Sequence, residues 1–186
     1  MKKFSKKYIS NLKTILDEID SSTVSKIVNL IDTTKGKIYI IGNGGSAATA
    51  SHMVNDLGAG LKRRSIRSFD VESLSENTSV CTALANDIGY ENIFYMQLKD
   101  KIKKDDLLIA ISCSGNSPNI VKAVKYAQKK NVKVIGITGF DGGKLRKKSD
   151  LSFHVQTSTG QYGIVEDVHM ILNHMIYTYF IENHSK

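Results

Sequence analysis

The chain has 186 residues and 41% hydrophobic content, which is enough for one sizeable core and short for two domains. Its formal net charge of +8 is spread as basic doublets without interleaved aromatic residues, so we expect a solvated surface that attracts anionic metabolites and no nucleic-acid site. Cys81 and Cys113 are too few for a disulfide framework, and no apolar run resembles a membrane span or a signal peptide. We therefore expect a cytoplasmic protein with free thiols.

Two amphipathic helices are predicted before the first strand. Apolar residues recur at helical spacing in residues 8–19 and again in residues 24–31, and Ser21 and Ser22 are placed to cap the second helix. The apolar stripe of such a leader must be covered, either by a second copy of the chain or by the chain's own core. We expect residues 1–34 to support homo-oligomerisation and residues 35–186 to form the α/β core of one domain.

Residues 37–56 are the most informative stretch of the chain. Residues 38–41 are apolar throughout, as in a strand that is buried on both faces of a parallel sheet. Three glycines and a serine follow this strand: Gly42, Gly44, Gly45 and Ser46. The glycines let an anion approach the backbone N–H groups, and the serine is placed to cap the next helix. The loop therefore predicts a phosphate site.

His52 and Asp56 lie four residues apart on that predicted helix, so both project from one face about one turn beyond the loop. They predict an acid–base or metal-ligand pair beside the anion. Two other interpretations stay open. One is a glycine turn without a ligand; the other is dinucleotide binding, because the loop also satisfies the weak pattern G-x-G-x-x-A, with Asp70 or Glu72 as the acidic residue.

A short strand and a helix are predicted in the middle of the chain. Residues 68–74 favour the strand, residues 80–88 carry apolar side chains at helical spacing, and a helical pattern continues in residues 93–98. Asn86 and Asp87 stand just before a glycine at the end of this helix. They either cap the helix or hydrogen-bond a sugar.

A second strand and loop are expected at residues 107–111 and immediately after them. The loop offers three hydroxyls and a thiol: Ser112, Cys113, Ser114 and Ser117. Ser117 and Pro118 fit the N-cap and first position of a helix, so hydroxyls and a helix amino terminus converge on one point suited to phosphate. No histidine lies in this local pattern, and we interpret Cys113 as a small buried thiol rather than a nucleophile.

The remainder alternates between helix and strand. A crossover helix is predicted in residues 119–130, a strand in 133–138, a glycine turn in 139–143, an edge strand in 151–155 and a closing helix in 161–184. This alternation predicts an α/β fold with a parallel sheet.

The closing helix carries two carboxylates and two histidines: Glu166, Asp167, His169 and His174. On an ideal helix Asp167 and His174 lie about 20° apart, and Glu166 and His174 about 80° apart. Geometry alone therefore favours Asp167 with His174 without excluding Glu166, and an exposed polar face is the alternative. His154 and His184 are interpreted as structural.

The order GNGGS, a helix with histidine, NDxG, ISxSGNS and a late helix with histidine resembles the SIS (sugar isomerase) domain. More closely it resembles the phosphoheptose isomerases, which make D-glycero-D-manno-heptose 7-phosphate from sedoheptulose 7-phosphate for activated heptose and surface polysaccharide. The resemblance covers nearly the whole chain. It implies a three-layer sandwich with a five-stranded parallel sheet flanked by helices, and a homotetramer whose active sites lie between subunits.

The resemblance also implies the site residues. Those that hold the sugar phosphate would be Asn43, Gly44, Gly45, Ser46, Asn86, Asp87, Ser112, Cys113, Ser114, Ser117 and Glu166. The residues that together can hold zinc would be His52, Asp56, Glu166 and His174. One carboxylate, of Asp56 or Glu166, would remove the proton alpha to the carbonyl, and His174 would serve the other oxygen as general acid. The metal would polarise the carbonyl.

The chain departs from the family pattern at four positions. Asp56 stands where the family has glutamate, Glu166 where it has glutamine, and Gly163 and Ile164 where it has aspartate and arginine. Aspartate is one methylene shorter, which can move a base by about an ångström. The open alternatives are transfer of the base to Glu166, a different sugar phosphate, or loss of catalysis. The remaining rivals are a non-catalytic protein that binds a replication initiator, and a sugar-phosphate sensor.

Overall fold

The computed structural model describes the backbone of residues 1–184 and the side chains of residues 1–183. Its centre is a five-stranded sheet in which every strand runs parallel to its neighbours, in the order β2-β1-β3-β4-β5. The strands are β1 (Ile38–Gly42), β2 (Val71–Ser73), β3 (Leu107–Ser112), β4 (Lys133–Phe140) and β5 (Leu151–Gln156). The five-stranded parallel sheet implied by the resemblance is confirmed.

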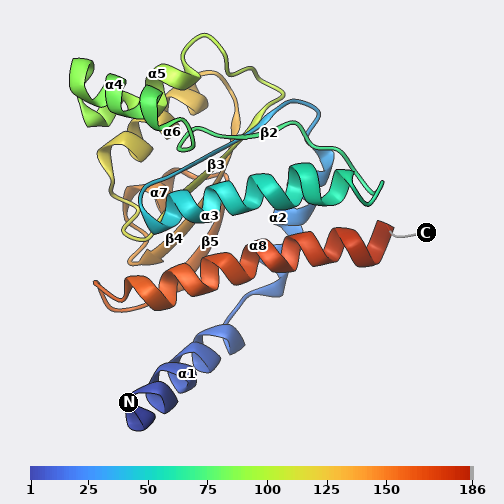
Figure 1. Ribbon diagram of the computed structural model, residues 1–186, viewed down its shortest axis with the longest axis vertical. Helices are drawn as coiled ribbons and strands as arrows, with labels where there is room; N and C mark the ends of the chain where they lie inside the picture. Colours follow the sequence, from blue (N-terminus) through green and yellow to red (C-terminus); the bar gives the residue numbers. More distant parts are fainter. Residues whose placement is uncertain (185–186) are drawn as a thin grey trace.

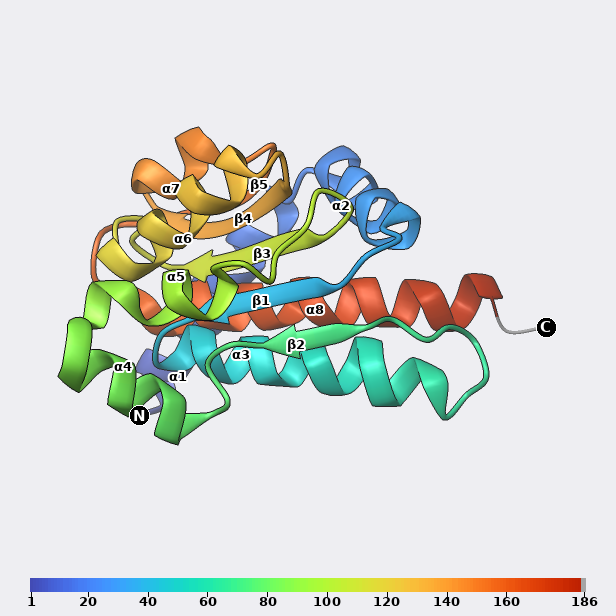
Figure 2. The ribbon, with the colours of Figure 1, turned by 90° about the horizontal axis from the view of Figure 1, so that it is seen from above.

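Helices cover both faces of this sheet (Figures 1 and 2). The helices are α1 (Lys2–Asp17), α2 (Ser21–Thr33), α3 (Gly45–Val54), α4 (Thr78–Ile88), α5 (Ile93–Leu98), α6 (Pro118–Lys129), α7 (Gly143–Lys148) and α8 (Tyr162–His184). None of these described helices is long and apolar enough to cross a lipid bilayer. The short helix α7 follows the predicted glycine turn and was not anticipated from the sequence.

Two hydrophobic cores lie on opposite sides of the sheet, because successive residues of a buried strand point to opposite faces. In β1, Ile38 and Ile40 belong to the core formed with α2, α3 and α8, whereas Tyr39 and Ile41 belong to the core formed with α5 and α6. Strands β1 and β3 are buried at every position. This explains why their sequences read as uninterrupted apolar runs.

The amino-terminal leader divides into two parts. Helix α2 buries Val24, Ile27, Val28 and Ile31 against the chain's own core. Helix α1 has no buried residue and extends beyond the layered body beneath α8 (Figure 1). The Tyr8 hydroxyl donates a 2.6 Å hydrogen bond to Asp167 of α8, and this bond raises the pKa of Tyr8 to about 12.

Two helix caps differ from the sequence prediction. Helix α2 is capped by Asp20, whose carboxylate accepts a 2.9 Å hydrogen bond from the Ser22 N–H, so the expected Ser21–Ser22 cap is wrong. Helix α3 is preceded by Gly44 at φ 54°, and Ser46 lies inside the first turn rather than at the cap. The positive φ makes glycine the suitable residue at position 44.

Phe180 offers a direct test of the core beneath α8. Its fully buried ring packs edge-on against Phe69 with ring centroids 5.4 Å apart. We expect Phe180→Ala to lower the free energy of unfolding by about 3–5 kcal/mol, because the deletion leaves a cavity. Phe4 of α1 is 64% exposed, and Phe4→Ala, which removes the same group, should change stability by less than about 0.5 kcal/mol. Urea unfolding measures both, and equal losses would contradict the described packing.

Candidate functional site

The two loops singled out in the sequence meet at the carboxyl edge of the sheet. β1 and β3 are neighbours, with Gly42 level with Ile111, and the strand order runs outward from this pair in both directions. Ligands of open α/β sheets bind at such a switch point. Asn43 and Asn119 exchange two side-chain hydrogen bonds of 3.0 and 2.9 Å across it. The loops after β1 and β3 are thereby fastened to each other.

A cavity of about 140 Å³ lies between these loops. Many of the residues that line it carry a hydroxyl. The lining consists of Asn43, Ser46, Ile111, Ser112, Cys113, Ser114, Ser117, Tyr162 and Glu166. The loops on either side lead into the amino termini of α3 and α6. Helix amino termini and hydroxyls favour anions, so we refer to this cavity as the anion pocket.

The Ser-rich side of the anion pocket is held by its own hydrogen bonds. The Ser112 hydroxyl lies 3.4 Å from the Ser117 hydroxyl and accepts a 3.2 Å bond from the Gly115 N–H. Gly115 has φ 63°, and a side chain there would overlap the Gly142 carbonyl. Ser117 is the N-cap of α6 and Pro118 its first residue, as the sequence predicted.

Three residues form a second constellation. His52, Asp56 and His174 each offer a ligand atom, and these atoms lie within 4.8 Å of one another. The two histidine Nε2 atoms are 3.2 Å apart, and the His52 Nε2 is 3.3 Å from an Asp56 carboxylate oxygen. Bonds of about 2.05 Å at the tetrahedral angle place ligands of zinc about 3.3 Å apart. The group therefore has the spacing and the donor types of a metal site, and we refer to it as the His/Asp/His group.

The Asp56 carboxylate is fixed by amides around it. Asn173 of α8 donates a 2.7 Å hydrogen bond to Oδ2, and Asn55 donates a 3.1 Å bond to Oδ1. Asp56 is 5% exposed and lies in a π-helical turn, residues 55–60, that continues α3. Such turns are frequent at functional sites. Amides that orient a ligand carboxylate are typical of metal centres.

Glu166 is not part of the His/Asp/His group. It lines the anion pocket, and its Oε1 accepts a hydrogen bond from the Cys113 thiol over 3.9 Å. A side chain at Gly45 would overlap the Glu166 carboxylate, so this carboxylate lies directly against the first residue of α3. Burial, reinforced by the charge of Glu166, raises the pKa of Cys113 to about 11, so the thiol is protonated at neutral pH.

Other predicted residues lie outside both constellations. The expected pair of Asp167 with His174 is not formed, because Asp167 accepts the hydrogen bond from Tyr8 while His174 faces His52. Ideal-helix angles consider one helix only, whereas both partners come from other helices. Asn86 and Asp87 are exposed on α4, bonded to each other over 2.9 Å, and do not line the anion pocket.

The other histidines with described side chains lie outside both constellations. His169 is 1% exposed, its Nε2 lies 3.1 Å from the Thr138 carbonyl, and burial lowers its pKa to about 4. His154 lies on β5, with ring nitrogens 3.0 Å from Thr138 and 3.0 Å from Gln156. The structural interpretation of His154 stays a prediction, and both contacts agree with it. The side chain of His184 lies outside the described residues.

Sequence reasoning missed four residues of the site: Asn55, Asn119, Tyr162 and Asn173. Asn119 and Asn173 are fully buried amides on otherwise apolar helix faces. A buried amide needs a partner, so an asparagine at an inward helical position is the signal that could have identified them. Tyr162 gave no such signal, because it stands at the first turn of α8 and is exposed.

The sequence is similar to a known protein family and to named proteins. A family model described as the SIS domain matches residues 7–139. The phosphoheptose isomerase of Helicobacter pylori (strain P12) is 36% identical over 167 residues, which cover 89% of this chain and 85% of that protein. The phosphoheptose isomerase of Rhodospirillum rubrum is 41% identical over 143 residues, or 76% of this chain and 73% of that protein.

The fold is also similar to that of a solved protein structure. The phosphoheptose isomerase from Neisseria gonorrhoeae superimposes with a TM-score of 0.81 at 28% identity, covering 96% of this chain and 93% of that one. The family match spans more than half of the chain, and the relatives align over most of their own length. The chain therefore belongs to the SIS-domain family and is a homologue of the phosphoheptose isomerases.

Proposed function

We propose that this protein is a phosphoheptose isomerase, which converts sedoheptulose 7-phosphate to D-glycero-D-manno-heptose 7-phosphate. The observation that carries the proposal is the placement of an anion pocket at the switch point of the sheet and of a His/Asp/His group at the far end of α3, where α8 supplies His174. Relatives that align over most of the chain bear the same name. We place the reaction in the cytoplasm and within one α/β domain. Its product supplies activated heptose for surface polysaccharide.

The anion pocket would hold the phosphate. Its serine hydroxyls and the amino terminus of α6 are neutral groups that can donate hydrogen bonds to a dianion, and they act against the repulsion of the Glu166 carboxylate in the same lining. Gly44 leaves the backbone just before α3 accessible, because nothing lies within 4 Å of a Cβ built there, whereas Gly45 is covered by the Glu166 carboxylate. We include Asn86 and Asp87 as sugar contacts on the strength of the family resemblance alone.

The His/Asp/His group would hold one divalent metal, which we propose to be zinc. Three protein ligands with a fourth position open to substrate is the arrangement of catalytic zinc. Two imidazoles and a carboxylate fit this ion, and the amides of Asn173 and Asn55 would keep the carboxylate in place. A metal bound here would polarise the sugar carbonyl and stabilise the enediolate.

The acid and base would come from the residues around this group. His174 is exposed and can reach a substrate oxygen, so we assign it as the general acid. Its Nε2 cannot bind a metal and donate a proton at the same time. The two proposed roles of His174 therefore alternate in time or use different ring nitrogens. For this reason, metal content and turnover must be measured on the same samples. The base is a carboxylate, Asp56 or Glu166.

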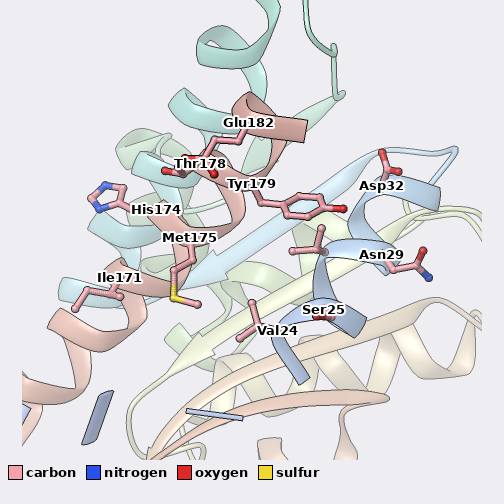
Figure 3. Close-up of a pocket in the computed structure, with 11 residues that line it drawn as sticks. Val24, Ser25, Asn29, Asp32, Ile171, His174, Met175, Thr178, Tyr179 and Glu182 are labelled. Atoms are coloured by element: carbon pink, nitrogen blue, oxygen red, sulfur yellow. The ribbon is translucent and has the colours of Figure 1, made fainter. Parts of the chain in front are cut away.

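We propose that a second copy of the chain covers the groove between α2 and α8 (Figure 3). This groove has a volume of about 610 Å³. Its lining combines the apolar residues Val24, Val28, Ile171 and Met175 with polar ones that include Asp32 and Glu182. His174 stands on its rim, so a copy seated in the groove would enclose the His/Asp/His group. This agrees with the family resemblance, which implies a homotetramer with active sites between subunits.

Turnover is tested by proton NMR of sedoheptulose 7-phosphate in heavy water, with and without zinc. We expect aldose anomeric signals and deuterium in the sugar for the wild-type chain, and a loss of about a hundredfold or more for His174→Ala. Asp167→Asn, a neighbouring change outside both constellations, should keep activity. A folded wild-type protein that forms no aldose and incorporates no deuterium would rule out the proposed reaction.

Metal binding is tested by elemental analysis of purified chains. We expect one metal per chain in the wild type, loss of most of it in His52→Ala, and zinc affinity weakened about 10–100-fold in Asn173→Leu, because Asn173 orients the ligand carboxylate. His154→Ala serves as the control, since His154 is bonded within β4 and β5. Equal metal content in His52→Ala and His154→Ala would refute the site.

Assembly is tested by light scattering coupled to size-exclusion chromatography. Met175 in the groove and Met96 outside it are each 37% exposed, so they form a matched pair. We expect Met175→Glu to lower the mass of the assembly, because it places a charge in an apolar interface, and Met96→Glu to leave it unchanged. A wild-type mass for Met175→Glu would exclude this groove as the interface.

A further inference from the structure

Tyr162 contributes a free hydroxyl to the anion pocket. It lines the pocket from the first turn of α8, and its hydroxyl bonds none of the residues that the structure describes. The side chain is 53% exposed, so this hydroxyl is available to a molecule that enters the pocket. A phenol O–H is more acidic than a serine hydroxyl and a stronger donor than a thiol. Tyr162 therefore supplies the strongest uncharged hydrogen-bond donor of the lining.

Several other polar groups of the pocket are engaged with one another. The hydroxyls of Ser112 and Ser117 lie 3.4 Å apart, and the Cys113 thiol donates to Glu166 over 3.9 Å. The Glu166 carboxylate also repels an anion that shares the pocket with it. A phosphate bound here thus gains from a further donor that belongs to neither of the two loops.

Phe140, the last residue of β4, holds the ring of Tyr162 in place. The two rings pack edge to face, with centroids 5.0 Å apart and planes at 82°. Phe140 is 3% exposed and has φ 54°, a left-handed conformation that is unfavourable for a residue other than glycine. Such conformations persist where the surroundings fix them, and they gather at ligand sites. Tyr162 therefore packs against a fixed partner, although half of its side chain is exposed.

The backbone beside Phe140 is tied to the pocket on one side and to α8 on the other. The Gly139 N–H donates a 2.9 Å hydrogen bond to the Cys113 carbonyl in the Ser-rich loop. A Cβ at Gly139 would overlap Val165, so the first turn of α8 packs directly on this glycine. The same backbone that shapes the loop of the pocket therefore also places the ring of Tyr162.

We propose that Tyr162 binds the phosphate of the substrate by donating a hydrogen bond from its hydroxyl, and that Phe140 is the positioning residue that orients the Tyr162 ring. The identity of the substrate rests on the proposed isomerase function, whereas the contact with phosphate does not. The phosphate takes no part in the bond changes at the carbonyl. Its contacts are therefore made equally before and during the reaction, and they act on KM rather than on kcat.

The first arm of the test is a calorimetric titration of the chain with inorganic phosphate, without turnover. We expect Tyr162→Phe, which removes only the hydroxyl, to weaken phosphate affinity about tenfold, because a hydrogen bond to a charged acceptor is lost. Tyr95→Phe is the matched control, since Tyr95 also packs edge to face, 5.0 Å from Tyr126, and lies outside the anion pocket. Unchanged affinity in Tyr162→Phe, an equal loss in Tyr95→Phe, or no phosphate binding by the wild-type chain would overturn the proposal.

The second arm tests whether Phe140 acts through Tyr162. Phe140→Leu keeps an apolar side chain and removes the ring. We expect it to weaken phosphate affinity about threefold or more in the wild-type chain and to have no effect in a Tyr162→Ala background, because two residues that act together are not additive. A purely structural role would give equal losses in both backgrounds and would refute the positioning role. Tyr162→Phe decides the binding role even where Phe140→Leu fails to fold.

The third arm separates this proposal from the proposed function by using sedoheptulose 7-phosphate. We expect Tyr162→Phe to raise KM about tenfold and to keep kcat within about twofold. A chain that binds phosphate through Tyr162 but neither isomerises nor deuterates the sugar would refute the isomerase and leave the binding role established. Turnover with the same KM in the wild type and Tyr162→Phe would refute the binding role and leave the isomerase established.

Discussion

The reciprocal amide pair of Asn43 and Asn119 fixes the geometry on which the site depends. Asn119 is fully buried, and without its partner its amide would cost about 1–3 kcal/mol. The pair joins the loop after β1 to the first turn of α6, and the Tyr90 hydroxyl adds a 2.9 Å bond to Asn43. The starting points of α3 and α6 are therefore set relative to each other, and the anion pocket is the space between them.

Helix α8 completes the site by contributing to both ends of α3. Glu166 and His174 are eight positions apart, or about 12 Å along a helix axis. One therefore reaches the anion pocket at Gly45, while the other reaches His52 and Asp56 at the far end of α3. This separation explains why the four residues expected to share a metal divide into a group of three and a single carboxylate.

The sequence predicted what depends on local pattern. Buried strands showed as apolar runs, helices showed as periodic apolar residues, and the Ser117–Pro118 start of α6 followed from backbone restrictions that act at one residue. Prediction from the sequence failed where a residue contacts another that is distant in the chain. Tyr8 meets Asp167, and His52 meets His174, across more than a hundred residues. No spacing rule within one helix predicts these pairs. The buried amides of Asn119 and Asn173 likewise contact residues that are distant in the chain.

The length of α3 links the fold to the choice of substrate. Gly45 and His52 are seven positions apart, which is about 10 Å along the axis. An isomerase that binds phosphate at the first position and reacts at the second requires a sugar whose phosphate and carbonyl stand at opposite ends of the molecule. A sugar with its phosphate one or two carbons from the carbonyl could not span this distance. On the proposed function, the helix that positions the ligands therefore also selects for the length of the sugar.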